Sequence, residues 1–264
     1  MIPSHQQNLQ PVPLASAACR RVWAERDDLL RLGVVPLVPL YLLFRTLESL
    51  QTTIFAELQK GPAGEPATLI DAVLRMSLAS LGLLMVVSVF SVNWIRRMTL
   101  GRAAVPGLGL NLGRRHLSFT LVMILLVAVP FVVSLVISTI LSLVGLVSIA
   151  LLASMLMMTI GYLVLLTRLS PAWIGIAIDA PMPFKIAWER TRGQGGRLIG
   201  ALLITAFPAF AAQWLLAMMF FGLGLLAAAP LAFSALSSFI SLVYMAVQVS
   251  LFVLAYPRFV SETV

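Results

Sequence analysis

Residues 117–167 read LSFTLVMILLVAVPFVVSLVISTILSLVGLVSIALLASMLMMTIGYLVLLT, and no charged residue or histidine interrupts them. A membrane-spanning helix needs about 20 predominantly apolar residues. The stretch is therefore too long for one crossing and long enough for two. We predict two spanning helices here, separated by a break near residues 142–145.

Four more apolar segments of similar length lie on either side of this stretch. They run over residues 29–50, 69–92, 198–225 and 231–256. The predicted fold is therefore all-α, a polytopic transmembrane bundle of about six spans arranged as three hairpins. Pro36 and Pro39 are expected to kink the first span. The predicted domains are a cytoplasmic polar tail (1–28), the six-span domain (29–258) and a short cytoplasmic tail (259–264).

The composition agrees with a membrane protein. Sixty per cent of the 264 residues are hydrophobic and 11 % are charged, and the mean hydropathy is +1.01. A soluble domain carries about a quarter charged residues, so this composition excludes an ordinary soluble catalytic domain. The net charge of +8 does not indicate nucleic-acid binding, because the basic residues flank the apolar spans. The single cysteine, Cys19, excludes an internal disulfide and is expected to be an unpaired thiol in the tail.

Basic residues are distributed unevenly between the two sides of the predicted membrane. They occur before span one, between spans two and three, between spans four and five, and after span six: Arg20, Arg21, Arg26, Arg31, Arg96, Arg97, Arg102, Arg114, Arg115, Arg168, Lys185, Arg190, Arg192, Arg197 and Arg258. The three opposite loops contain only Lys60. Because cytoplasmic loops retain Lys and Arg, both termini are predicted to lie on the cytoplasmic side of a bacterial inner membrane. Four of the five tryptophans, Trp23, Trp94, Trp173 and Trp188, fall near the same predicted boundary, where interfacial rings are common.

The three hairpins share a pattern of flanking charge. An arginine-bearing segment precedes each hairpin, and Arg96, Arg168 and Arg258 follow its second helix. This pattern is consistent with a hairpin module used three times. Any bundle with a cytoplasmic N-terminus alternates in the same way, so the repeat and the simple alternation both remain open.

Charged residues within the spans are candidates for a functional site, because they are costly in lipid. Arg45 and Glu48 lie three residues apart in span one, and Asp71 and Arg75 lie four apart in span two. Each spacing puts two partners on one helix face. We expect an intramembrane charge cluster of four residues at the outer interface, with a structural role favoured over a substrate site.

Polar residues in later spans form stripes at helical spacing. Span six carries one stripe, formed by Ser234, Ser237, Ser241, Tyr244 and Gln248. Span three carries a second stripe, formed by Ser134, Ser138 and Ser142, and span five adds Gln213. Such stripes are typical of helix contacts, with a polar path for a solute as the alternative. Spans three to six contain no ionisable Asp, Glu, His, Lys or Arg, which disfavours proton-coupled transport.

No catalytic or metal-binding motif is evident. His5 and His116 are the only histidines and lie far apart, so we expect no metal site and no cofactor. Gly107, Gly109 and Gly113 resemble a phosphate loop only in spacing. They follow no strand, and we interpret them as a turn-rich connection.

The loop between spans four and five mixes apolar and basic residues and carries Pro171, Pro181 and Pro183. We interpret it as a segment that lies in the headgroup layer. It is expected to form a collar for anionic phospholipid headgroups together with the loop between spans two and three. The predicted collar consists of Arg96, Arg97, Arg114, Arg115, Lys185, Arg190, Arg192 and Arg197. Gly196 with Gly200 would let span five pack closely.

This loop also carries a family resemblance. It reads RLSPAW at 168–173, AIDAP at 177–181 and AWERTRG at 187–193, and an earlier loop reads WIRRMTLG at 94–101. These segments resemble loops in bacterial multi-span proteins related to the membrane domain of glycerophosphodiester phosphodiesterases. The soluble catalytic domain of those enzymes is absent from this chain. The resemblance therefore implies a membrane-embedded, non-catalytic module.

We therefore expect a non-catalytic inner-membrane protein with a structural or accessory role in the membrane or envelope. The alternatives are a small-molecule or lipid permease that uses the polar stripes, and a membrane-embedded enzyme. The expected partners are the lipid bilayer with its anionic headgroups, and a membrane-protein partner or a second copy of the chain; nucleic acid is not expected.

Overall fold

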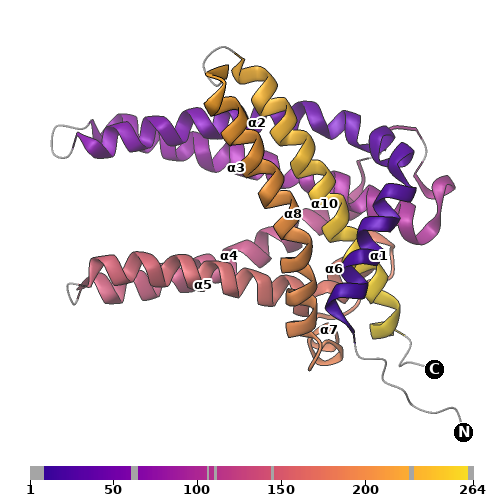
Figure 1. Cartoon of the computed structure of the whole chain (residues 1–264). Helices are drawn as coiled ribbons and strands as arrows, with labels where there is room; N and C mark the ends of the chain where they lie inside the picture. Colours follow the sequence, from indigo (N-terminus) through magenta and orange to yellow (C-terminus); the bar gives the residue numbers. More distant parts are fainter. Residues whose placement is uncertain are drawn as a thin grey trace, which may run out of the picture.

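The charge-free stretch at residues 117–167 forms a helical hairpin, and two further hairpins accompany it (Figure 1). The structure is a computed structural model that describes residues 9–60, 65–105, 107–109, 112–143, 146–225 and 229–260. The long helices are α2 (Arg26–Gln59), α3 (Pro66–Leu100), α4 (Arg114–Leu143), α5 (Val147–Arg168), α8 (Gly195–Gly222) and α10 (Pro230–Val260). Helix α4 ends inside the predicted break, which confirms that the stretch makes two helices; residues 144 and 145 lie outside the described residues.

The number of helices that can cross a membrane agrees with the prediction. Five helices, α2, α3, α4, α8 and α10, are long and apolar enough to do so. The number is six if one bent pair is counted as a single span; in this pair residues 152–168 of α5 are followed by α6 (Ser170–Ala177) at an angle of 59°. The chain is thus an all-α, multi-pass membrane protein. Helix α2 continues through Pro36 and Pro39, and its 34 residues make it about 51 Å long, which exceeds a hydrocarbon core of about 30 Å.

The segment predicted to be a polar tail contains a packed helix instead. Helix α1 (Pro11–Ala24) lies against α10 and α8, and it buries Leu14, Ala18 and Val22 at a spacing of four. Two of its four buried residues are alanines, which give little hydropathy signal. For this reason the hydropathy of α1 did not indicate a packed helix, and the polar residues before it indicated a tail.

The best-packed core lies where α1, α6 and the ends of the hairpins meet. Trp173 of α6 contacts Phe252 of α10 edge to face, with 5.1 Å between ring centroids, and Phe119 of α4 at 5.9 Å. Trp94 of α3 donates a hydrogen bond from Nε1 to Ser250 Oγ of α10 at 2.8 Å. Both tryptophans are buried, so their prediction as interfacial rings was wrong. They close a protein core instead, whereas Trp23 and Trp188 are exposed.

Helix α10 is the central element of this arrangement. In its most apolar window 56 % of the residues are buried, against 17–28 % in the other four long spans. The α2–α3 and α4–α5 hairpins leave the core in the same direction with their ends apart, and the α8–α10 hairpin runs in another direction (Figure 1). The hairpins therefore present large apolar faces away from the protein, as lipid contact requires. The end of the molecule that holds α1, α6 and the arginines Arg97, Arg115 and Arg168 is called the basic end below.

Candidate functional site

The expected four-charge cluster is divided into two separate ion pairs. Arg45 lies 3.3 Å from Glu48 within α2, and Arg75 lies 2.8 Å from Asp71 within α3. All four side chains are at least 40 % exposed. Within the described part of the chain, no salt bridge joins the two pairs across the helices. The partner one turn away on the same helix pairs with each charge. The shared cluster of four residues stays a prediction.

The polar stripe of α10 packs against α8. Gln213 of α8 donates from Nε2 to the Ser237 carbonyl at 2.9 Å and to Ser241 Oγ at 3.3 Å, and it accepts from Ser237 Oγ at 2.8 Å. Gln248 donates to the hydroxyl of Tyr244, and Ser234 bonds to the Pro230 carbonyl. The three bonds of Gln213 support the packing interpretation for α8 and α10.

The stripe of α4 does not join the stripe of α10. Ser134 is buried and donates to the carbonyl of Phe131 in its own helix, whereas Ser138 is half-buried and Ser142 is exposed. The two stripes therefore do not line one continuous path.

A buried ionic clamp fixes α2 to α3 at the basic end. Arg97 of α3 donates from Nε to Asp28 at 2.8 Å and from Nη2 to Glu25. Asp28 also lies 3.2 Å from Arg31 and 3.3 Å from Arg102; Arg102 belongs to the short 3₁₀ helix η2 (Arg102–Ala104). Sequence analysis weighed only the basic residues here and missed Glu25 and Asp28, although both acids stand within the basic segment.

A second ionic contact joins α3, α4 and the turn after α6. Arg96 donates to the Ala177 carbonyl at 3.1 Å and to Asp179 Oδ2 at 2.7 Å. Arg115 of α4 lies 3.2 Å from the same carboxylate oxygen. Asp179 has a φ of +61°, a conformation that Asp adopts more readily than most residues. Two guanidinium groups thus share one carboxylate.

The loop between α5 and α8 is also held by defined contacts. Arg168 donates to the carbonyls of Thr191 and Trp188, and its guanidinium lies 4.5 Å from the centre of the Trp188 ring. Arg190, at the end of α7 (Phe184–Arg190), donates to the Phe259 carbonyl at 3.0 Å. These contacts make the loop part of the folded basic end.

The predicted lipid collar is therefore heterogeneous. Five of its members bond to protein groups: Arg96, Arg97, Arg115, Arg190 and Arg197. The other three, Arg114, Lys185 and Arg192, are exposed. The prediction treated all basic residues alike because the spacing of charges does not reveal which of them have acidic or carbonyl partners.

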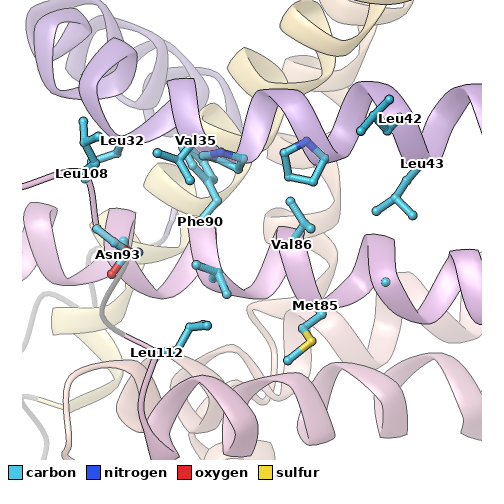
Figure 2. Close-up of a pocket in the computed structure, with 15 residues that line it drawn as sticks. Leu32, Val35, Leu42, Leu43, Met85, Val86, Phe90, Asn93, Leu108 and Leu112 are labelled. Atoms are coloured by element: carbon cyan, nitrogen blue, oxygen red, sulfur yellow. Dashed lines mark hydrogen bonds between the residues drawn. The ribbon is translucent and has the colours of Figure 1, made fainter.

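An apolar groove of about 550 Å³ lies between α2 and α3. Figure 2 shows Asn93 near one end and Leu42 and Leu43 at the other. Gly82 leaves space in its wall, because an added Cβ there would lie 3.3 Å from Leu43 Cδ2. Its lining is otherwise aliphatic or aromatic, apart from Asn93: Leu32, Val35, Pro36, Pro39, Leu42, Leu43, Gly82, Met85, Val86, Val89, Phe90, Leu108, Gly109 and Leu112.

A polar pocket of about 280 Å³ adjoins this groove at the basic end. It is lined by Arg96, Arg115, His116, Ala104, Val105 and Gly113, and it shares Asn93, Gly109 and Leu112 with the groove. Gly107 and Gly109 have φ angles of +60° and +72°, as expected of a turn. Asn93 Nδ2 donates to the Gly109 carbonyl at 2.6 Å. An added Cβ at Gly109 would lie 2.8 Å from that nitrogen, so only glycine lets the loop close on Asn93.

His116 faces the polar pocket with one ring nitrogen unused. The backbone N–H of Gly113 donates to His116 Nδ1 at 3.1 Å, so a neutral ring carries its proton on Nε2. The side chain is buried, and Nε2 has no hydrogen-bond partner among the described residues. Such a buried donor is uncommon. Sequence analysis considered His116 only as a metal ligand; over the ranges that the structure describes, no three His, Cys, Asp or Glu residues are grouped to hold a metal ion.

Comparisons of this chain with protein-family models, with curated proteins and with solved structures gave no match. The resemblance to the membrane domain of glycerophosphodiester phosphodiesterases therefore stays a prediction.

Proposed function

We propose that the protein is a non-catalytic scaffold of a bacterial inner membrane that holds anionic lipid at its cytoplasmic, basic end. The observation that carries this proposal is the contrast between the two parts of the molecule. Ionic and aromatic contacts fix the basic end, whereas the hairpins diverge from it and expose aliphatic side chains. Such a shape spreads apolar surface into lipid and keeps charge at one membrane surface.

The polar stripes give less support to the permease alternative. Gln213 and Ser237 satisfy each other across α8 and α10, and the α4 stripe is directed elsewhere. A solute path needs polar groups that face an open channel. An accessory role with a membrane-protein partner, or with a second copy of the chain, fits the exposed hairpin faces.

The test is retention of lipid by the purified, full-length protein in native mass spectrometry. Changing Arg114, Lys185 and Arg192 to Gln removes three exposed charges from the basic end. We expect fewer bound phosphatidylglycerol or cardiolipin molecules than in the unchanged protein. The matched control changes Arg45, Lys60 and Arg75 to Gln, which removes three charges near the other end of α2 and α3. Equal loss in both variants, or no loss in either, would contradict the proposal.

A further inference from the structure

The groove and the polar pocket adjoin each other and together provide an apolar and a polar part. They share the lining residues Asn93, Gly109 and Leu112. The groove has a volume of about 550 Å³ and the polar pocket a volume of about 280 Å³. Ligand pockets in proteins are commonly roughly 300–1,000 Å³ and mostly apolar, with a few placed polar groups. The site has this character: a long aliphatic part and a compact polar part at one end.

The polar part is suited to an anion. Arg96 and Arg115 bring two positive charges, and Asp179 brings one negative charge. The Asp179 side chain is 56 % exposed, so water weakens its hold on the two guanidinium groups. Two guanidinium groups are a donor set that a phosphate accepts well.

The direction of the site matches a lipid in a bilayer leaflet. The polar pocket lies at the basic end, beside Arg96 and Arg115. From Asn93 the groove follows α2 and α3 away from that end, toward Leu42 and Leu43 (Figure 2). A molecule with its charged head at the membrane surface and an apolar chain toward the membrane interior would fit in this direction.

We propose that this site binds one anionic phospholipid, with its phosphate at Arg96 and Arg115 and one acyl chain between α2 and α3. The inference rests on the proposed contact of the basic end with anionic lipid, and it adds a discrete site to that diffuse attraction. Charge complementarity selects an anionic headgroup over a zwitterionic one, and the aliphatic groove selects a lipid over a soluble phosphate.

The test compares two arginines at the basic end. Arg115→Gln removes a pocket cation, whereas Arg20→Gln removes an exposed cation of α1 that lines neither the pocket nor the groove and does not belong to the predicted collar. Affinity of the full-length protein for one phosphatidylglycerol is measured by native mass spectrometry in detergent, with phosphatidylcholine, oleate and inorganic phosphate as competitors. We expect Arg115→Gln to weaken the tightest binding event about tenfold, as loss of a charge-assisted contact does. We expect Arg20→Gln to leave that event unchanged.

A second pair of variants tests the groove. Val89→Trp fills the cavity that Val89 lines, and Leu78→Trp adds the same bulk at an exposed position of α3 outside it. Phosphatidylglycerol with a photoreactive acyl chain should crosslink to α2 and α3 at the groove residues in the unchanged protein and in Leu78→Trp. We expect the crosslink to be lost in Val89→Trp. Thermal unfolding checks that each variant is folded.

Several results would overturn the site. Equal weakening by Arg20→Gln and Arg115→Gln would leave only a diffuse attraction of the basic end for anionic lipid, so the proposed function would stand without the site. Equal affinity for phosphatidylcholine would show that the site does not select an anionic headgroup. Full competition by oleate or inorganic phosphate would show that the site does not require a phospholipid. Loss of all anionic lipid preference would overturn the proposed function as well.

Discussion

The ionic clamp at the basic end gives a stability prediction with a matched control. Arg97 is 14 % exposed and bonds Asp28, which is 7 % exposed, and Glu25, which is 17 % exposed. Arg97→Ala removes two charge-assisted hydrogen bonds and leaves two largely buried carboxylates with fewer partners. Each such bond contributes about 1.5–3 kcal/mol, and breaking a buried pair costs about 3–5 kcal/mol.

The remaining partners reduce the expected loss. Asp28 keeps Arg31 and Arg102, and Glu25 keeps Arg21 at 3.1 Å. We therefore expect Arg97→Ala to lower the free energy of unfolding by about 3 kcal/mol, at the lower end of the range for a broken buried pair.

The assay is equilibrium unfolding in mild detergent with a denaturing detergent as titrant. The control is Arg45→Ala, which breaks the exposed Arg45–Glu48 pair and should cost about 0–1 kcal/mol. Adding Glu25→Gln and Asp28→Asn to Arg97→Ala should recover part of the loss, because neither carboxylate is then left without the Arg97 guanidinium. An Arg97→Ala cost no larger than that of the control would refute the clamp.

Three further predictions concern the two exposed ion pairs, the contact between α8 and α10, and the Cys19 thiol. Arg45→Ala and Asp71→Ala should destabilise the protein additively in thermal unfolding, because they belong to separate ion pairs; a measurable coupling energy would support the shared cluster. Gln213→Ala and Ser237→Ala should show a coupling of about 0.6 kcal/mol in a double-mutant cycle, typical of hydrogen bonds between membrane helices, and zero coupling would contradict the α8–α10 contact. A membrane-impermeant maleimide should label the exposed Cys19 in inside-out vesicles and not in intact cells. Partial burial raises the pKa of the Cys19 thiol, so labelling should be slower than for a free thiol at neutral pH and should accelerate as the pH rises.

Hydropathy alone predicted the hairpins, because a spanning helix needs only length and apolar character. The predicted spans agree with α2, α3, α4, α5, α8 and α10 to within several residues. The bend between α5 and α6 was not predicted, although Pro171 marks the first turn of α6. Apolar content alone does not distinguish a residue that faces lipid from one that packs in the protein. For that reason the sequence did not reveal that Trp94 and Trp173 are buried inside the protein.

The candidate site was less predictable than the fold. Arg96 and Arg115 were singled out as lipid contacts, but their shared partner Asp179 lies 64 residues beyond Arg115 in the chain. The groove needs Gly82 opposite Leu43, and no local pattern records that pairing. Gly109 was correctly interpreted as part of a turn. Its carbonyl contact with Asn93 depends on how the loop folds back on α3, which the sequence does not reveal.

The distribution of hydrogen bonds indicates how such a shape is stable. Along the hairpins, Ser80 and Thr139 bond to carbonyls one turn back in their own helices. These two hydroxyl groups can therefore enter lipid with their hydrogen bonds already made. At the basic end the bonds cross between distant parts of the chain, as from Trp94 to Ser250 and from Arg96 to Ala177. The relative placement of the hairpins is therefore set at the basic end, where the groove and the polar pocket also meet, so a lipid bound there would contact the elements that fix the fold.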